Sequence, residues 1–221
     1  MIKEQSTLET NHIEAMIDIE TMGTTAGSPI LTIGAVLFDP RRCDSIDLLE
    51  RRSLLIRIDV SDAIKHSEGV DGTTLRWWLE QEDAAIKELV GDDLVSTEEA
   101  LLKLSRYCKE RGDFTNNEFF EGISQLPEAT SFWAKDPDFD MVLLRYVYDL
   151  LNIPLPWKFW ECRSVRTIQD LAWADPGDRP KFAAGTLHDA RADAISQAML
   201  VQAAYKELGK GAPEVELSTY K

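Results

Sequence analysis

The segment that most constrains the fold is the run PILTIGAVLF, Pro29–Phe38, in which nearly every residue is apolar. A strand that is apolar along both faces is buried on both, so this run is expected at the centre of a sheet. In Ile13–Ile19, apolar residues instead alternate with Glu14, Met16 and Asp18, at the two-residue period of a strand. Together with a third strand at Ser53–Val60, these segments predict a sheet that starts with three antiparallel strands.

Capping residues and helical periodicity predict the remaining elements. Thr73 or Thr74 is expected to cap a helix through Trp77 and Trp78, and Ser96 forms a capping box with Glu99 at the start of the next helix. The loops at 69–73, 91–95, 112–127 and 175–185 are too short for an interdomain linker. We expect a single domain over residues 1–221, with its core at about 13–208 and flexible termini. Further strands are expected at Ser131–Lys135 and Phe159–Arg163, and further helices at about 142–151 before Pro154, about 164–174, and about 190–208 before Gly209.

Length and charge exclude several classes of protein. The chain has 221 residues, with 24 Lys and Arg against 39 Asp and Glu, which gives a net charge of −15 and a pI of about 4.6. Proteins that coat duplex nucleic acid need a broad basic face, so this chain is not expected to be one of them. No apolar run approaches the ~18 residues of a membrane span, and the polar N-terminal segment lacks the core of a signal peptide. We therefore expect a cytoplasmic protein without a membrane partner.

The cysteines do not predict a disulfide or metal-binding framework. Cys43, Cys108 and Cys162 are odd in number and form no CxxC pair, so neither a disulfide scaffold nor a zinc ribbon is expected. They are interpreted as buried or inert thiols.

Two acidic side chains lie together at the end of the first predicted strand. Asp18 and Glu20 are two residues apart, so both point to one face, while Ile17 and Ile19 point to the other. The strand then enters a turn at Gly23. Taken alone, this pair fits a solvated strand edge as well as a functional pair of carboxylates.

Two later segments also concentrate ionisable residues. Asp136, Asp138 and Asp140 precede an apolar helix, where an acid can cap backbone N–H groups. His188 stands just before the last helix and Asp193 lies about one turn into it, so a loop histidine and a helix aspartate are expected to converge. A lone histidine is more often structural, but a histidine beside acids is a usual general base near neutral pH.

These residues resemble the three motifs of a known family. DIET at Asp18–Thr21, FD at Phe139–Asp140 and H-x-A-x-x-D at His188–Asp193 are similar, in order and spacing, to the motifs of the DEDDh 3′-to-5′ exonucleases, which have a ribonuclease H-like fold. LRWW at Leu75–Trp78 and KFWECRSVRT at Lys158–Thr167 look more narrowly like exonuclease A of T-even bacteriophages and the related bacterial exoribonuclease-like domains. The resemblance covers about 13–208. It implies an α/β domain with a mixed sheet of about five strands flanked by helices, working in a bacterial or phage-infected cytoplasm.

The resemblance also implies the roles of the motif residues. Phe139 selects Asp140 over Asp136 and Asp138, because the family's acid directly follows an aromatic, although Lys135–Asp138 departs from the Gly or Asn common there. Asp189 is interpreted as a helix cap. The implied metal-binding carboxylates are Asp18, Glu20, Asp140 and Asp193, with His188 as the general base.

Electrostatics gives these four acids a reason to bind cations. Carboxylates about 4 Å apart repel by about 4 kcal/mol per pair at an effective dielectric near 20, and four of them make six pairs. Two divalent ions would cancel the charge of −4 and support in-line attack on a phosphodiester. Oxygen ligands favour Mg²⁺ or Mn²⁺. The expected reaction releases nucleoside 5′-monophosphates from the 3′ end of a single strand, with DNA favoured over RNA.

Substrate contacts and alternatives complete the expectations. Trp77 or Trp78 is expected to stack on single-stranded bases, with the other in the core. A binding scaffold without turnover is the alternative of another class, and the chain is expected to be a monomer or homodimer. The residues expected to contact the substrate are Thr21, Met22, Gly23, Trp78, Arg163 and Arg166, each with an ordinary turn, core or surface role as the alternative.

Overall fold

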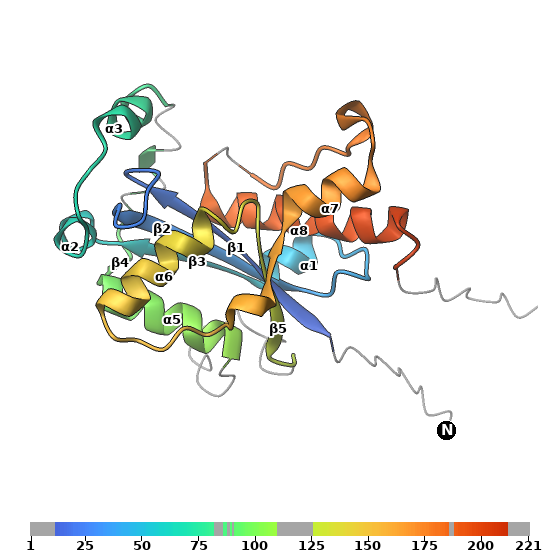
Figure 1. Cartoon of the computed structure of the whole chain (residues 1–221), viewed down its shortest axis with the longest axis horizontal. Helices are drawn as coiled ribbons and strands as arrows, with labels where there is room; N and C mark the ends of the chain where they lie inside the picture. The colour runs from blue at the N-terminus through green and yellow to red at the C-terminus, as the bar shows by residue number, and fades with distance from the viewer. Residues whose placement is uncertain are drawn as a thin grey trace, which may run out of the picture.

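A six-stranded mixed sheet forms the centre of the structure, a computed structural model that describes residues 12–81, 86, 87, 89, 91–109, 126–185 and 188–211. The strand order is β4-β3-β2-β1-β5-β6 (Figure 1). β2 is antiparallel to both β1 and β3, whereas β5 runs parallel to β1, β6 parallel to β5 and β4 parallel to β3. The strands are β1 (Ile13–Thr21), β2 (Ile30–Phe38), β3 (Ser53–Ile58), β4 (Leu94–Val95), β5 (Ala129–Ala134) and β6 (Cys162–Ser164).

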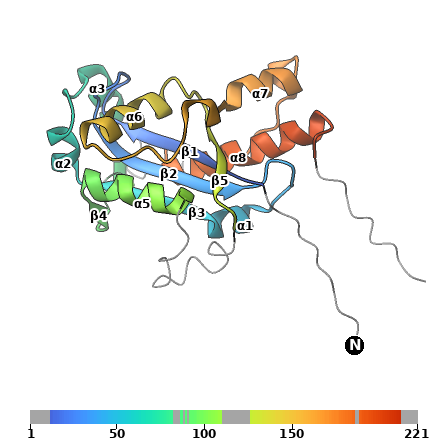
Figure 2. The ribbon, with the colours of Figure 1, turned by 60° about the horizontal axis from the view of Figure 1, so that its bottom comes forward.

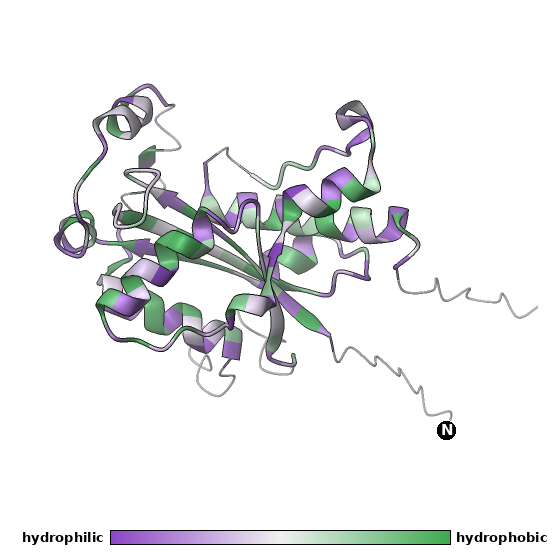
Figure 3. Cartoon of the chain, in the orientation of Figure 1, coloured by the Kyte–Doolittle hydropathy of each residue, from purple (hydrophilic) through white to green (hydrophobic). Residues whose placement is uncertain are grey.

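Helices cover both faces of this sheet. One hydrophobic cluster joins α5 and α6 to one face, and a second joins α1, α7 and α8 to the other (Figures 1 and 2). Figure 3 shows hydrophobic residues along the strands and on the helices α5 and α6. The helices are α1 (Ile46–Arg51), α2 (Val60–Lys65), α3 (Gly72–Leu79), α5 (Thr97–Lys109), α6 (Asp140–Leu150), α7 (Val165–Ala172) and α8 (Ala190–Glu207), with short 3₁₀ turns η3 (Phe159–Glu161) and η4 (Pro176–Asp178).

The two faces of β1 follow the alternation in its sequence. Ile17 and Ile19 are buried in the cluster with α5 and α6, while Met16 belongs to the opposite cluster with α8. Asp18 is on the same face as Met16, and so points toward α8. β2 is buried at all nine positions, which confirms its predicted place inside the sheet. The antiparallel start of three strands is also confirmed.

Gly34 lets α8 approach the sheet closely. A Cβ atom built at Gly34 would lie 2.1 Å from the carbonyl carbon and oxygen of Ala190, the first residue of α8. In the register of the sheet, Gly34 is the partner of Asp18. The absence of a side chain on β2 thus brings the N-terminus of α8 against the sheet beside Asp18.

Several expected boundaries were wrong. The loop expected at 91–95 contains β4, which pairs with Arg57 and Ile58 and gives the sheet a sixth strand in place of about five. The strand expected from Phe159 begins at Cys162, because Glu161 accepts a hydrogen bond from the Lys158 N–H and closes the η3 turn first. The third helix is capped by Asp71 and not by Thr73 or Thr74, since the Asp71 carboxylate accepts from the Thr74 N–H at 2.8 Å.

Other expectations are confirmed. Ser96 accepts a hydrogen bond from the Glu99 N–H at the start of α5, which is half of the expected capping box, while the Glu99 carboxylate pairs with Lys103 at 3.0 Å. Gly209 has the positive φ of a helix C-cap. Cys43, Cys108 and Cys162 are free, but Cys43 is exposed, so burial accounts fully only for Cys108. None of the helices in the described part of the chain is long and apolar enough to cross a membrane. Most of the loop expected at 112–127 lies outside the described residues, and the single-domain organisation stays a prediction.

Candidate active site

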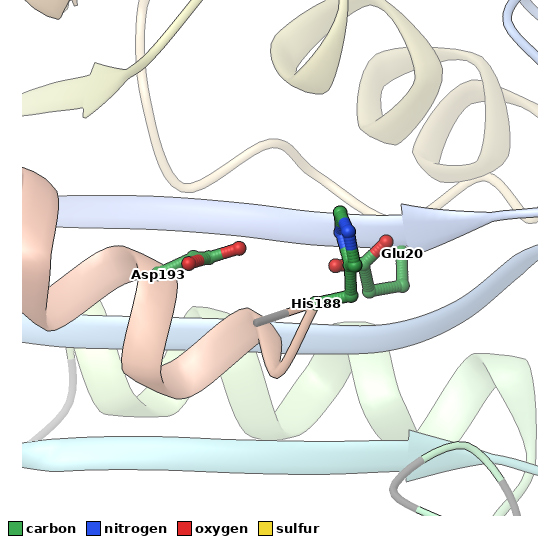
Figure 4. A group of neighbouring side chains, drawn as sticks. All are labelled: Glu20, His188 and Asp193. Atoms are coloured by element: carbon green, nitrogen blue, oxygen red, sulfur yellow. The ribbon is translucent and has the colours of Figure 1, made fainter. Parts of the chain in front are cut away.

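Three ionisable side chains from distant parts of the chain meet at the end of β1. Potential ligand atoms of Glu20, His188 and Asp193 all lie within 4.8 Å of one another. Figure 4 shows Glu20 on β1 beside His188, with Asp193 on the first turn of α8 pointing toward them. The loop histidine and the helix aspartate therefore converge as their spacing predicts, and they do so on the acidic face of β1.

The backbone around His188 explains how the loop and the helix reach one point. His188 has φ 63°, a left-handed conformation that is uncommon outside glycine. Asp189 caps α8 by accepting hydrogen bonds from the N–H groups of Arg191 and Ala192 at 2.9 and 3.3 Å. This confirms the interpretation of Asp189 as a cap, and it leaves Asp193 as the acid of this segment that points toward Glu20.

Asp18 is held from α8. The side-chain amide Nε2 of Gln197 donates a hydrogen bond to Oδ1 of Asp18 at 2.7 Å. Gln197 lies one helical turn after Asp193, so both side chains leave the same face of α8. Its amide Oε1 is buried and has no hydrogen-bond partner within the described structure. The sequence analysis did not identify Gln197, although its spacing of four residues from Asp193 was a usable signal.

Asp140 completes the group from the opposite side of the sheet. It is the first residue of α6, is buried, and forms a hydrogen bond with the backbone of Ile19. Asp136 instead pairs with Arg166, with 2.6 Å between Arg166 Nε and the carboxylate, and Asp138 is exposed. Of these three acids, Asp140 is therefore the one that is buried beside the site, as its position after Phe139 indicates.

The four carboxylates share one electrostatic environment. Burial, together with the charges of Asp193 and Asp140, raises the pKa of Glu20 to about 8. Burial raises the pKa of Asp140 to about 7, against hydrogen bonds from the backbone. Burial is the main cause that holds the pKa of Asp18 well above its usual range, and the negative charges of Asp140, Glu20 and Asp193 act in the same direction. Each acid therefore resists ionisation beside the others, which is the condition that a cation or a proton relieves.

Basic groups do not neutralise this cluster. Within the described ranges, none of the ion pairs involves Asp18, Glu20, Asp140 or Asp193. Burial raises the pKa of Asp193, and the nearby His188 and Lys135 oppose this rise without forming a salt bridge to it. The carboxylate oxygens fit a hard divalent cation, and the His188 imidazole lies beside them.

A pocket of ≈530 Å³ opens beside Glu20. Its walls include Glu20, Thr21 and Phe139 from the site and Asp71 and Trp77 from the region of α3. Met22 and Gly23 do not line it. Met22 packs against the core, and Gly23 has no room for a side chain, because a Cβ atom there would lie 2.3 Å from Ser28 Oγ.

The two tryptophans of α3 differ in exposure. Trp78 is 3% exposed and donates a hydrogen bond from Nε1 to the carbonyl of Thr21 at 2.9 Å, so the expectation of an open stacking face on Trp78 is wrong. Trp77 is 40% exposed, and its ring centroid lies 4.7 Å from that of His188 at 85°. Both tryptophans line the pocket, and the helical turn places the wider exposed indole surface on Trp77.

Arg163 and Arg166 do not reach the carboxylates. Arg166 is paired with Asp136, and Arg163 donates to the backbone carbonyls of Trp160 and Cys162 at 2.8 and 2.9 Å. Neither of these arginines lines the pocket. The substrate contacts expected of Arg163 and Arg166 therefore lie outside this pocket.

Comparison with known proteins places this geometry in a family. Residues 13–205 match the domain family described as 3′-5′ exoribonuclease Rv2179c-like. The chain belongs to the Rv2179c-like 3′-5′ exoribonuclease domain family.

Two further proteins are similar to this chain, one in sequence and one in fold. An exodeoxyribonuclease of Enterobacteria phage T4 is 24% identical over 168 residues, which is 69% of this chain and 68% of the phage protein. The nuclease domain of 3′hExo, a DEDDh family member solved with bound rAMP, superposes with a TM-score of 0.56 at 11% identity, covering 92% of this chain and 96% of that domain. The Rv2179c-like chain is thus a 3′-5′ exonuclease domain, and it shares the ribonuclease H-like fold of that DEDDh nuclease.

Proposed function

We propose that this exonuclease removes nucleoside 5′-monophosphates from the 3′ ends of single strands, using two divalent cations and His188 as the general base. The observation that carries the proposal is the convergence of Glu20, His188 and Asp193 within 4.8 Å, beside the half-buried Asp18 and the buried Asp140. When bound, Mg²⁺ or Mn²⁺ would supply the positive charge that the carboxylates lack and that the phosphodiester develops during attack. Asp18, Glu20, Asp140 and Asp193 would hold these ions.

The protein's own residues account for the remaining steps. His188 accepts the proton of the attacking water at a ring nitrogen, and the edge-to-face contact with Trp77 restrains the orientation of its ring. The pocket beside Glu20 receives the terminal nucleoside, with Trp77 as its more exposed aromatic surface. Thr21 and Phe139 form part of the wall, which limits the entry of bulk water.

We propose RNA as the first candidate substrate and DNA as the second. The family matched over residues 13–205 is named for exoribonucleases, whereas the phage relative named for DNA shares 24% identity over 168 residues. DNA, favoured by the sequence analysis, is therefore the alternative. Digestion of matched single-stranded RNA and DNA at equal salt distinguishes them through kcat/KM, and a 3′-phosphate should block both if the free end is recognised.

Substitutions of two neighbouring acids, Asp140 and Asp138, test the proposed mechanism. Asp140→Asn is expected to abolish Mn²⁺-dependent release of mononucleotides, because it removes a buried charge from the cluster. Asp138→Asn is the matched control, since Asp138 is exposed two residues earlier, and it should keep the wild-type rate. Full activity in a folded Asp140→Asn variant would overturn the proposed mechanism.

A second pair tests the general base. His188→Ala is expected to lower kcat by about 10² to 10⁴ while Mn²⁺ binding, measured by calorimetry, stays close to wild type. His66→Ala is the control, because His66 ends α2, lies 3.7 Å from Asp62 and does not belong to the group of Glu20, His188 and Asp193. If His188→Ala lost Mn²⁺ binding with activity, His188 would be a metal ligand and not the base.

A further inference from the structure

Two large aromatic side chains project from the surface between α6 and β6. Phe159 is 72% exposed and Trp160 is 58% exposed, and their ring centroids lie 4.8 Å apart at 85°. Both belong to the η3 turn, which Glu161 closes by accepting a hydrogen bond from the Lys158 N–H. The fold therefore holds two adjacent rings in a fixed turn without burying them. Exposed aromatic surface of this kind is typical of a contact site.

Two cations lie beside these rings, and a third, Arg145, lies near β6, which follows them in the chain. Lys158 Nζ lies over the Trp160 ring, 5.4 Å from its centroid, and Arg163 is tied to the turn by its bond to the Trp160 carbonyl. Arg145 of α6 and Arg163 both act on the pKa of the Cys162 thiol, which burial raises and these arginines lower. Arg145 is therefore close to β6. Within the described part of the chain, Arg145, Lys158 and Arg163 form no ion pair with a carboxylate.

These cations lie beside exposed rings in a chain whose overall charge is negative. The chain carries a net charge of −15, and other arginines, such as Arg41 and Arg166, are paired with aspartates. Cations beside exposed rings are the combination that single-stranded nucleic acid recognises, because bases stack on the rings and phosphates pair with the cations. We call Arg145, Lys158, Phe159, Trp160 and Arg163 the aromatic–basic patch.

We propose that the aromatic–basic patch binds the part of a single strand upstream of the 3′ end while that end occupies the active site. This proposal rests on the proposed function. The sheet register gives their separation: Cys162, which follows the rings, pairs with Phe132, and Phe132 pairs with Ala15, five residues before Glu20 and thus about 17 Å from it along the strand at ~3.3 Å per residue. A strand a few nucleotides long spans such a separation, so long substrates gain contacts that short ones lack.

The test compares strand binding at two lengths. Binding of 5′-labelled oligonucleotides of about 20 and about 3 nucleotides to the full chain is measured by fluorescence anisotropy in EDTA, which prevents metal-dependent hydrolysis. Phe159→Ala with Trp160→Ala, and separately Arg145→Gln, should weaken binding of the long strand at least about fivefold and leave the short strand unchanged. Arg145→Gln should also reduce the dependence of long-strand binding on salt.

Matched controls separate the patch from general surface effects. Leu171→Ala removes a 69% exposed apolar side chain on α7, and Arg51→Gln removes an exposed cation on α1, on the opposite face of the sheet. Both should bind both strands like wild type. In turnover assays, the patch variants should raise KM for the long strand with kcat unchanged.

Every other outcome contradicts the proposed role of the aromatic–basic patch in strand binding. Equal binding by variant and wild type overturns it, and an equal loss for both lengths shows that the variants act through the active site. A change from dimer to monomer without a length-dependent effect, measured by light scattering, would make the patch a self-association surface. The two proposals fail in different experiments. Unchanged activity in Asp140→Asn would contradict the proposed function, whereas the role of the aromatic–basic patch is tested by binding measured without turnover.

Discussion

At the scale of single residues, Gln197 decides how Asp18 is presented. Its amide is buried, at 8% exposure, and donates to Asp18 Oδ1 from the turn of α8 that follows Asp193. A neutral donor fixes the rotamer of the carboxylate without cancelling its charge, so Asp18 stays available to a cation. Residues that orient a ligand in this way commonly affect metal affinity almost as strongly as the ligand itself.

Gln197→Met keeps the length of the side chain and removes the hydrogen bond. We expect it to weaken Mn²⁺ binding and raise the Mn²⁺ concentration for half-maximal activity by about 10- to 100-fold. Calorimetric titration with Mn²⁺ and rates over a series of Mn²⁺ concentrations measure the two quantities.

A second buried glutamine of the same helix provides the control. Gln202 is 3% exposed and donates to the Asp39 carbonyl and to Asp44 Oδ2 at 2.9 Å each, away from the site. Gln202→Met should lower the melting temperature without changing Mn²⁺ affinity. If both variants altered Mn²⁺ affinity equally, Gln197 would have only a structural role.

At the scale of elements, the site depends on how closely α8 approaches β2. His188 precedes α8 and Asp193 lies in its first turn, while Asp18 and Glu20 are on the neighbouring β1. Gly34, the register partner of Asp18, is where the Ala190 backbone contacts the sheet. The distance between these acids is therefore set by backbone packing at one glycine.

Gly34→Ala should push the start of α8 away from the sheet. A Cβ atom 2.1 Å from backbone atoms requires a shift of the helix, and overpacking of this kind costs about 1–3 kcal/mol. We expect a melting temperature lower by roughly 2–4 °C per kcal/mol and a larger fall in kcat/KM than stability alone explains. Thermal unfolding and kinetics below the transition measure both.

Gly72→Ala is the control for the loss of a glycine. A Cβ atom there meets nothing within 4 Å, so the melting temperature should be unchanged or slightly higher. Wild-type stability and activity in Gly34→Ala would mean that α8 can move without moving His188 and Asp193.

At the scale of the whole molecule, the buried acids couple stability to pH and to metal. Burial raises the pKa of Glu20 to about 8 and that of Asp140 to about 7, well above the values of an unfolded chain. The folded protein therefore holds protons that the unfolded chain releases. The resulting stabilisation is fully present below the unfolded pKa values near 4 and is lost as pH rises through about 7 to 8.

In EDTA, the melting temperature should fall between about pH 6 and about pH 9, and Mn²⁺ should restore it at the higher pH, because the cation replaces the lost protons. Glu20→Gln should flatten this dependence, whereas Glu80→Gln, on the exposed end of α3, should not. Calorimetric scans across pH provide the measurement. A melting temperature that rises with pH in EDTA would show that these acids are ionised in the folded protein.

The sequence alone determined most of the elements, because these depend on local spacing, while the candidate acids came from its resemblance to a known set of motifs. The apolar run of β2, the alternation in β1 and the motif order around Asp18, Asp140 and Asp193 are properties of neighbouring residues. Short elements such as β4 and η3 escaped prediction, since a two-residue pairing and a single capping carboxylate leave little pattern.

Only the tertiary structure decided which side chains meet. It buried Trp78 and exposed Trp77, brought Gln197 to Asp18, and gathered Arg145 with Lys158 and Arg163. The physical reason is that these contacts join residues far apart in the chain, so they follow from how α6 and α8 pack on the sheet and not from the pattern of any one segment.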